Sequence, residues 1–355
     1  MVNSFAEVLA AKRDKVWGVI EGYLGNPKYP QAFSIPSHYD GLCRAHWEIV
    51  REYPERKGKY IRPTLVMLTA AAMGVRESLA LQTAAAMQVS EDWLLIHDDL
   101  EDDSEFRRGK PTLHKMFGDK LAINAGDALH VIMWKILLDN QKILKKDVFL
   151  RVLEEFYVML TRTVLGQGGE IKWAIDGRIG LDDSDWFFIA DGKTSYYTVA
   201  GPMRLGGIIA GGTPQQLSLL TDFGKRLGRC YQLVDDILDL TSDFRGLKGK
   251  LRFNDLYEGK TTMILAHLLR SARKSEREEI INFLAKPRGD KKESEVLKIV
   301  GLMHKRGSIM YAREKAKKIG EEARDIFEGR LRFLSKNPAR SYLKMGISFI
   351  LDRDY

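Results

Sequence analysis

Acidic side chains gather between residues 98 and 103 of this 355-residue sequence, directly after an apolar run. On a helix, Asp98, Asp99 and Asp102 share one face, where their like charges repel one another unless a cation neutralises them. Carboxylate oxygens suit Mg²⁺, which fills the rest of its coordination shell with water and phosphate oxygens. Arg107 and Arg108, just downstream, suit bidentate contacts to phosphate. These residues predict a site for a phosphate ligand bridged by a metal ion.

A second acidic motif follows another apolar helical pattern much later in the chain. Asp235, Asp236 and Asp239 repeat the Asp-Asp-x-x-Asp spacing of the first motif. One such motif is weak evidence, because acidic residues near helix ends are common and usually solvated. Two copies at the ends of long apolar helices indicate that both sets line one cavity, which can then hold several Mg²⁺ ions and a diphosphate.

Long apolar patterns of helical period must position both motifs, and no convincing series of alternating strands is present. The helices that carry the motifs are expected at residues 77–103 and 213–240. Acidic residues at the C-terminal end of a helix oppose its dipole, so local stability does not explain them. We expect an all-α chain with one domain over residues 1–355, a loop at 244–260, bends at Gly192 and Gly201, and an interruption at 166–169. Further helices are expected at 1–25, 42–53, 64–73, 120–139, 146–175, 184–190, 193–210, 261–272, 275–285, 292–306, 308–329 and 340–352.

Composition indicates a cytoplasmic protein without stable membrane insertion. Hydrophobic residues make up 45% of the chain, enough for a substantial core, but they form no uninterrupted run long enough to span a bilayer. Cys43 and Cys230 have no metal-ligand spacing, which fits a reducing compartment. The net charge of +8 comes from the C-terminal part, where lysines and glutamates alternate at helical spacing. A solvated helix face explains that pattern better than a nucleic-acid partner does.

Seven short motifs are spread along nearly the whole chain. They are Gly58-Lys59-x-x-Arg62-Pro63, Asp98-Asp99-x-x-Asp102, Arg107-Arg108-Gly109, Gly166-Gln167, Lys193-Thr194, Gln232-x-x-Asp235-Asp236-x-x-Asp239 and Asp255-Leu-x-x-Gly259-Lys260-x-Thr262. In order and spacing these motifs resemble those of the trans-type isoprenyl diphosphate synthases, the farnesyl and geranylgeranyl diphosphate synthase family, and archaeal members in particular. The resemblance implies an all-α bundle of long helices around a deep central cavity, usually in a homodimer.

The resemblance implies a Mg²⁺-dependent condensation of isopentenyl diphosphate with dimethylallyl, geranyl or farnesyl diphosphate. It assigns up to three Mg²⁺ ions to Asp98, Asp99, Asp102, Asp235, Asp236 and Asp239. The allylic diphosphate is expected at Arg107, Lys193, Thr194, Gln232 and Lys260, and the isopentenyl diphosphate at Lys59, Arg62 and Arg108. Catalysis is thereby assigned to Asp98, Asp99, Asp102, Arg107, Lys193, Asp235 and Lys260. Cations stabilise the departing diphosphate, and a dry apolar pocket protects the resulting carbocation.

Glu91 departs from the family pattern. Family members usually carry His or Gln seven residues before the first motif, where that side chain contacts isopentenyl diphosphate. A carboxylate there repels the diphosphate unless it is protonated or paired with a cation such as Lys59. The loop from Thr241 to Asp255 is also longer than usual, which leaves the roles of Lys248 and Lys250 open.

Residues one or two helical turns before the first motif are expected to determine product length. They are Trp93 and Leu94, then Ser90, then Met87. An aromatic residue only at the fifth position before the motif resembles the archaeal type that makes the twenty-carbon product, so geranylgeranyl diphosphate is expected. Two alternatives remain open. The bulk of the Trp93 indole would stop the chain at fifteen-carbon farnesyl diphosphate, and Ser90 permits twenty-five carbons if Trp93 turns aside.

Two other functions fit parts of the sequence. A class I terpene cyclase shares the bundle and the ionisation chemistry, but it usually has a different second motif and needs neither Lys59 nor Arg62. A non-catalytic subunit of a heteromeric synthase tends to lose acidic residues, whereas this chain keeps both motifs. Turnover that requires isopentenyl diphosphate, by the purified chain alone, would separate the synthase from both alternatives.

Overall fold

The computed structural model of the protein describes residues 4–25, 35–178, 180–241 and 253–351, and it is almost entirely helical. The N-terminal half contains α1 (Phe5–Leu24), α2 (Asp40–Glu55), α3 (Ile61–Ala72), α4 (Ser78–Glu101), α5 (Leu113–Phe117), α6 (Asp119–Asp139) and α7 (Lys146–Ile175). The C-terminal half contains α8 (Asp183–Ile189), the π-helix η4 (Ala190–Ala200), α9 (Gly201–Ile209), α10 (Pro214–Thr241), α11 (Asn254–Glu258), α12 (Met263–Ser271), α13 (Lys274–Leu284), α14 (Glu293–Lys305), α15 (Ser308–Gly329) and α16 (Ala339–Leu351). Short 3-10 turns are η2 (Ser37–Tyr39), η3 (Asn140–Lys142) and η5 (Arg288–Asp290).

The all-α prediction is confirmed, and α4 and α10 are the helices that carry the two acidic motifs. The side chain of Thr213 accepts a hydrogen bond from the Gln216 backbone N–H at 3.2 Å, and Pro214 follows as the first residue of α10. This is the N-terminal signal that the sequence contains, since Pro lacks the N–H that the first turn leaves unpaired.

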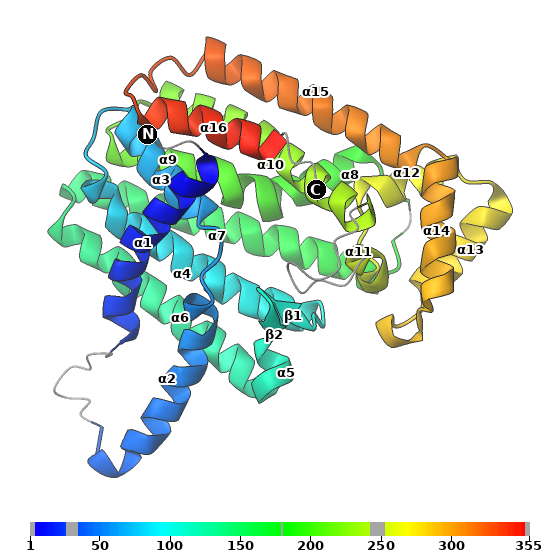
Figure 1. The fold of residues 1–355 in the computed structure, drawn as a ribbon, viewed down its shortest axis with the longest axis horizontal. Helices are drawn as coiled ribbons and strands as arrows, with labels where there is room; N and C mark the ends of the chain where they lie inside the picture. The colour runs from blue at the N-terminus through cyan, green and yellow to red at the C-terminus, as the bar shows by residue number, and fades with distance from the viewer. Residues whose placement is uncertain (1–3, 26–34, 179, 242–252, 352–355) are drawn as a thin grey trace.

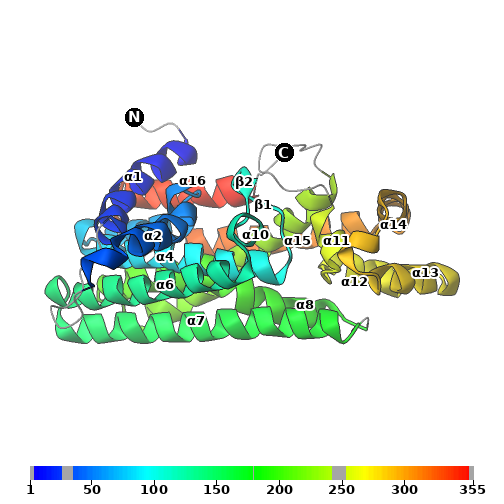
Figure 2. The same ribbon diagram turned by 90° about the horizontal axis from the view of Figure 1, so that it is seen from below.

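The two motif helices lie inside the bundle rather than on its surface (Figures 1 and 2). Helix α4 packs mainly on α6 and α3, and α10 packs mainly on η4 and α15. Helices α12, α13 and α14 extend from one end of the bundle in both views. Because α4 is covered on several sides, small residues such as Ala84, Ala85 and Ala86 are fully buried along it. This packing fixes the ends of both helices relative to one another.

The predicted interruption at residues 166–169 is wrong, because α7 continues through it to Ile175. Gly166 has a packing function instead. A Cβ atom there would lie 2.6 Å from the backbone nitrogen of Lys193, so only glycine lets η4 cross α7 so closely. Between the bend points expected at Gly192 and Gly201, the chain forms the wider turns of the π-helix η4.

Among the short elements that the sequence did not predict are a hairpin after α4 and a helix within the expected loop at 244–260. Residues Phe106–Arg107 (β1) and Lys110–Pro111 (β2) form a two-residue antiparallel hairpin just after α4. The described part of the expected loop at 244–260 contains α11, while Lys248 and Lys250 lie outside the described residues. Neither element is long enough to show the periodicity on which sequence patterns depend.

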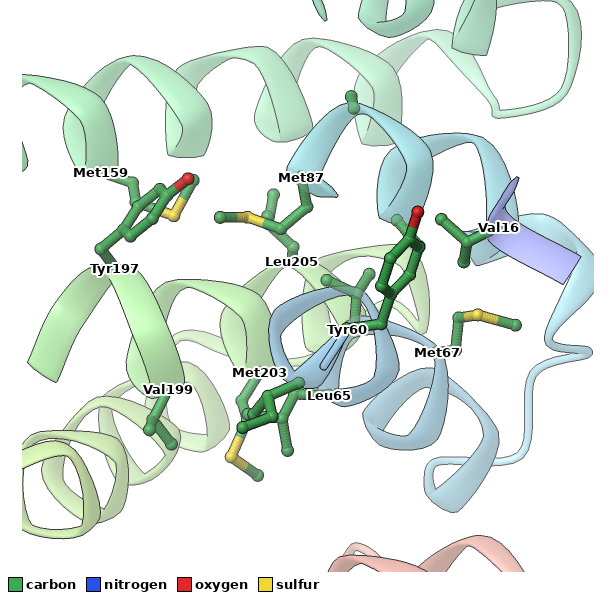
Figure 3. Close-up of a cluster of buried hydrophobic side chains, with 14 of the residues drawn as sticks. Val16, Tyr60, Leu65, Met67, Met87, Met159, Tyr197, Val199, Met203 and Leu205 are labelled. Atoms are coloured by element: carbon green, nitrogen blue, oxygen red, sulfur yellow. The ribbon is translucent and has the colours of Figure 1, made fainter. Parts of the chain in front are cut away.

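A tightly packed core lies where α3, α4, α7, η4 and α9 meet (Figure 3). Met87, Met159 and Tyr197 point toward one another from three of these elements, and all three side chains are buried. Methionine side chains are flexible and fill irregular gaps between helices. Tyr197 also lines the cavity described below, so this core lies directly behind part of the cavity wall.

Candidate active site

A cavity of about 1520 Å³ lies between the motif-bearing ends of α4 and α10. Both acidic motifs contribute side chains to its lining. They are Asp98 and Asp102 from the first motif and Asp235, Asp236 and Asp239 from the second. The predicted basic residues Lys59, Arg62, Arg107, Arg108, Lys193 and Lys260, together with Thr194 and Gln232, line the same cavity. The structure thus brings together residues that are far apart in the sequence.

Asp99 is the member of the first motif that does not line the cavity. Its side chain is 1% exposed, and the Tyr53 hydroxyl donates a hydrogen bond to its Oδ2 at 2.6 Å. Arg107 Nε donates to both Asp99 oxygens at 2.9 Å. The Asp99 charge raises the pKa of Arg107 even though burial alone would lower it, so Arg107 stays charged. The structure therefore places Asp98 and Asp102, but not Asp99, where they face a cation bound in the cavity.

Two lysines stand against the first acidic motif. Lys193 Nζ lies 3.4 Å from Asp98 Oδ1 and 2.7 Å from Oε2 of Glu170. Lys260 Nζ lies 2.6 Å from Asp102 Oδ2 and 2.6 Å from Glu258 Oε2. Ammonium groups so close to carboxylates can exchange those partners for phosphate oxygens when a diphosphate enters.

Burial shapes the charge of the first motif. It raises the pKa of Asp102 to about 7, with the nearby Asp98 charge adding to the rise and Lys260 opposing it. Lys193 shows the reverse balance, because burial alone lowers its pKa while Asp98 and Glu170 raise it overall. A bound cation would relieve this crowding of carboxylates.

The second acidic motif is held by a chain of hydrogen bonds from η4. The Thr194 hydroxyl donates to Gln232 Oε1 at 2.7 Å, and Gln232 Nε2 donates to Asp236 Oδ1 at 2.7 Å. The other oxygen of Asp236 is buried without a hydrogen-bond partner among the described residues. Burial, with the Asp255 charge adding to it, raises the pKa of Asp236 well above its usual value. A buried carboxylate oxygen of this kind fits a cation ligand.

Asp239 is fixed differently. It accepts hydrogen bonds from the backbone N–H groups of Asn254 at 3.1 Å and Asp255 at 3.2 Å. These bonds join the end of α10 to the start of α11, which leads to Lys260. Asp239 therefore supports the placement of the lysine as well as facing the cavity.

Within the described part of the chain, no three Asp, Glu, His or Cys side chains stand close enough together to hold a metal ion by themselves. The carboxylates instead stand on two walls of the cavity. Mg²⁺ suits such a site, because it keeps several waters and usually combines one or two carboxylates with phosphate oxygens. The donor set therefore fits Mg²⁺ bound together with a diphosphate.

Glu91 lies between two arginines of the cavity lining. Its Oε2 is 3.1 Å from Arg62 Nη1, and its Oε1 is 3.7 Å from Arg108 Nη2. Sequence reasoning missed Asp92, which accepts a hydrogen bond from Arg108 Nη1 at 2.8 Å and whose pKa burial raises to about 6. Gly58 leaves room for this arrangement, since a Cβ there would lie 2.7 Å from Arg108 Nη2. The carboxylates keep the arginines in place but offset part of their positive charge.

The residues expected to determine product length divide into two groups. Trp93 and Leu94 line the cavity, whereas Ser90 and Met87 are fully buried behind it. The Ser90 and Tyr197 hydroxyls share a hydrogen bond of 2.8 Å. Because Tyr197 also lines the cavity, Ser90 lies directly behind the Tyr197 side chain, one helical turn before Trp93 on α4.

Glu170 and Glu258 are further residues that sequence reasoning missed. Gln167 Nε2 donates a hydrogen bond to Asp98 Oδ1 at 3.2 Å, and Glu170 lies one helical turn after Gln167. The Gly166-Gln167 motif could therefore have pointed to Glu170 as a neighbour of the site. Glu258, two positions before Lys260, is 3% exposed on its side chain and also pairs with Arg288 at 3.2 Å. Both glutamates hold lysines that face the cavity.

This all-α bundle with its cavity has the fold of the isoprenyl diphosphate synthases. A family model described as polyprenyl synthetase matches residues 45–303, well over half of the chain. The chain belongs to this family, and the resemblance drawn from the motifs is confirmed.

Individual relatives match most of this chain. A short chain isoprenyl diphosphate synthase of Methanothermobacter thermautotrophicus is 30% identical over 298 residues, which are 84% of this chain and 87% of that protein. The structure of a geranylgeranyl pyrophosphate synthetase from Pyrococcus horikoshii matches with a TM-score of 0.82 at 28% identity, covering 98% of this chain and 99% of that one. A geranylgeranyl pyrophosphate synthase from Corynebacterium glutamicum, solved with isoprenyl diphosphate and magnesium, matches with a TM-score of 0.82 at 23% identity over 99% of both chains.

The names of the relatives span several product lengths. Proteins from Sulfolobus acidocaldarius, Aeropyrum pernix and Haemophilus influenzae are named geranylgeranyl, geranylfarnesyl and octaprenyl diphosphate synthases, and they are 30%, 29% and 30% identical to this chain. Similarity of this degree establishes a prenyltransferase family and leaves the product to be argued from the cavity.

Proposed function

We propose that this protein is a Mg²⁺-dependent prenyltransferase that condenses isopentenyl diphosphate with dimethylallyl, geranyl and farnesyl diphosphates to all-trans geranylgeranyl diphosphate. The observation that carries the proposal is one cavity with carboxylates of both acidic motifs and two lysines at one end. Its lining also includes the apolar side chains of Trp93 and Leu94. A charged end suits a diphosphate, and an apolar wall suits a prenyl chain.

The allylic diphosphate belongs at the lysine end of the cavity. Lys193 and Lys260 would turn from their carboxylate partners to the diphosphate oxygens, with Arg107 beside them. When bound at the two acidic motifs, up to three Mg²⁺ ions supply Lewis-acid stabilisation of the departing diphosphate. The protein's own cations stabilise the same developing charge, and the apolar wall excludes water from the carbocation. The released diphosphate can take the proton lost after condensation.

Isopentenyl diphosphate belongs at Lys59, Arg62 and Arg108. Arg62 is aligned by a hydrogen bond to Thr198 Oγ1 at 2.9 Å and by stacking over the Tyr197 ring at 4.8 Å. Its guanidinium therefore presents a fixed fork to a phosphate group.

Incubation of the purified chain with Mg²⁺, isopentenyl diphosphate and each allylic primer tests the proposal. Products identified by mass should have twenty carbons as the main species. A main product of fifteen or twenty-five carbons would overturn the proposed chain length but support the proposed reaction. Turnover of an allylic diphosphate without isopentenyl diphosphate would instead indicate a terpene cyclase, and a chain inactive until a second subunit is added would indicate a regulatory partner.

Glu91→Gln is expected to lower the KM for isopentenyl diphosphate by about three- to tenfold with little change in kcat. The neutral amide keeps the size of the side chain but no longer offsets the charge of Arg62, which is 3.1 Å away. Steady-state kinetics with isopentenyl diphosphate varied at saturating allylic substrate measure the effect. Glu105→Gln, which removes a charge from an exposed residue, is the matched control. A raised KM would show that Glu91 aids binding by ordering the arginines.

Trp93→Ala is expected to lengthen the main product by at least one five-carbon unit. The indole lines the cavity, and the small residue Ser90 lies buried one turn earlier on α4. Removing the ring frees its own volume for the growing chain. Mass analysis of products from farnesyl diphosphate and isopentenyl diphosphate gives the answer, with Leu297→Ala, at an exposed position on α14 outside the cavity lining, as the control. An unchanged product length would remove Trp93 as the residue that stops the chain.

A homodimer is part of the proposal. Helices α6 and α7 carry exposed apolar side chains, namely Leu121, Ile123, Val131, Leu138, Leu150, Tyr157, Val164 and Leu165. Residues Asp119–Lys142 are also long and apolar enough to cross a membrane, with 44% of the apolar window buried, but core helices of soluble proteins pass the same test. A face shared with a second copy explains these exposed side chains, in a cytoplasmic protein without membrane insertion. Light scattering during size-exclusion chromatography should give twice the mass of the 40.4 kDa chain.

The single synthase domain expected over residues 1–355 remains part of the proposal. It is supported by the cavity lining, which takes residues from as far apart as Ala6 on α1 and Phe349 on α16. Limited proteolysis should release no stable fragment that keeps activity.

A further inference from the structure

Trp93 is in contact with a histidine from the neighbouring helix. The indole of Trp93, on α4, stacks on the imidazole of His130, on α6, with ring centroids 4.1 Å apart and an angle of 16° between the rings. Trp93 lines the cavity, whereas His130 does not. His130 therefore lies behind the indole and out of reach of a prenyl chain.

His130 is itself held in place by a second tryptophan. Trp134 lies one turn further along α6, and its Nε1 donates a hydrogen bond to His130 Nε2 at 2.9 Å. Burial lowers the pKa of His130, with the His97 charge adding to the effect and Asp127 opposing it. A neutral imidazole with its proton on Nδ1 is the form that accepts this bond.

The other side of the indole is confined from within α4. His97 lies one turn after Trp93, with its ring edge-on to the indole at 6.3 Å and 82°. His97 in turn fits against Gly126 of α6, where a Cβ atom would come within 2.3 Å of His97 Nε2. Helices α4 and α6 are therefore closely packed next to Trp93.

Ring contacts must fix the orientation of Trp93, because its indole nitrogen is buried without a hydrogen-bond partner among the described residues. A stacked aromatic pair contributes orientation as well as buried area. Without His130, the indole keeps its bulk but loses the flat surface that holds it across the cavity. Truncation of His130 leaves a gap beside the indole, and a rotation of Trp93 into that gap gives the growing chain more room.

We propose that His130 is a positioning residue for product length, which holds the Trp93 indole in the orientation that stops the growing chain. The inference rests on the proposed prenyltransferase function and assigns part of its specificity to a residue that touches no substrate. Product length is then a property of the Trp93–His130 pair, carried on two helices, and not of Trp93 alone.

Four variants test the pair: His130→Ala, His130→Phe, Trp93→Ala and the double variant Trp93→Ala/His130→Ala. His130→Ala should lengthen the main product by one five-carbon unit, while the rate of the first condensation with dimethylallyl diphosphate stays within about twofold of wild type. His130→Phe keeps a flat ring behind the indole and should keep the wild-type product. The double variant should give the same product as Trp93→Ala, because His130 acts only through the indole.

Binding of unreactive thiolo analogues of prenyl diphosphates gives a second readout that needs no turnover. His130→Ala should bind a twenty-five-carbon analogue about tenfold more tightly than wild type and a ten-carbon analogue equally well. If His130→Ala does not fold, as judged by circular dichroism, His130→Val takes its place, because Val fills part of the volume without a flat ring.

The outcomes separate the two proposals. A wild-type chain that forms no prenyl product would refute the proposed function itself. Wild-type product length in His130→Ala, beside longer products from Trp93→Ala, would overturn the role of His130 and leave the function intact. Longer products in His130→Phe, or a double variant that exceeds Trp93→Ala, would equally overturn it, because His130 would then act independently of the stacked ring.

Discussion

Asp98→Asn and Asp235→Asn are each expected to lower kcat by about 10² to 10³ fold while leaving the protein folded. Asp98 and Asp235 face the same cavity from α4 and α10, so each change removes a charged ligand from one wall of the metal site. Asparagine has the same shape, but its neutral oxygen is a weaker ligand for Mg²⁺ and holds no counter-charge. The remaining carboxylates still stand near Lys193 and Lys260, which explains why substrate binding should weaken less than turnover.

Kinetics at a series of Mg²⁺ concentrations measure this effect. Both variants should need more Mg²⁺ for half-maximal rate, and chelation of the metal should remove the activity of the wild-type chain. Asp325→Asn, which removes an exposed charge on α15, is the control and should retain wild-type rates. Near-normal turnover in both cavity variants would refute the metal site, and loss in only one would mean that the metal is held from a single wall.

Much of this site could be predicted because it depends on short motifs on long helices. The apolar period predicts the extent of α4 and α10, and the two matching acidic motifs predict a shared cavity. Because an α-helix has a fixed rise per residue, a long helix fixes the distance between its two ends. The Lys193-Thr194 pair followed from the family resemblance instead, and η4 presents it to the cavity.

Other features depend on contacts between helices, which one sequence does not reveal. The glycines at 166–169 signalled a helix break, yet Gly166 is where η4 crosses an unbroken α7. The pairing of Glu91 with Arg62 and the stacking of Trp93 on His130 each join two segments that meet only in the folded chain. Periodicity shows which face of a helix is buried, but it does not identify the partner across that face.

Asp99 shows the same limit within the first motif. Spacing placed it on one helical face with Asp98 and Asp102, and the resemblance assigned all three to the metal. In the structure its oxygens are taken up by Tyr53 and by Arg107. Residues on roughly the same helical face can therefore have different surroundings. Asp98 and Asp102 line the cavity, whereas Asp99 packs against Tyr53 and Arg107.

Asp99→Asn is accordingly expected to lower the free energy of unfolding by about 3 to 5 kcal/mol, because it breaks the bidentate pair of a buried carboxylate with Arg107 and leaves that guanidinium with the more distant Asp98 carboxylate at 3.5 Å. Tyr53→Phe removes a single hydrogen bond to the same carboxylate and should cost about 1.5 to 3 kcal/mol. Asp98→Asn, one residue away but facing the cavity, should change stability by less than about 1 kcal/mol. Urea unfolding without Mg²⁺ or substrate measures all three.

This stability series separates two roles that the motif spacing cannot distinguish. If Asp99 is a metal ligand, Asp99→Asn should resemble Asp98→Asn, with wild-type stability and a raised Mg²⁺ requirement. If Asp99 instead orders Arg107, the variant should unfold early and, where still folded, bind allylic diphosphate more weakly at an unchanged Mg²⁺ requirement. The contacts favour the second result, because the Asp99 carboxylate is already neutralised by a guanidinium and lies outside the cavity lining. The charge of Asp99 then acts on the substrate only through the arginine that it holds.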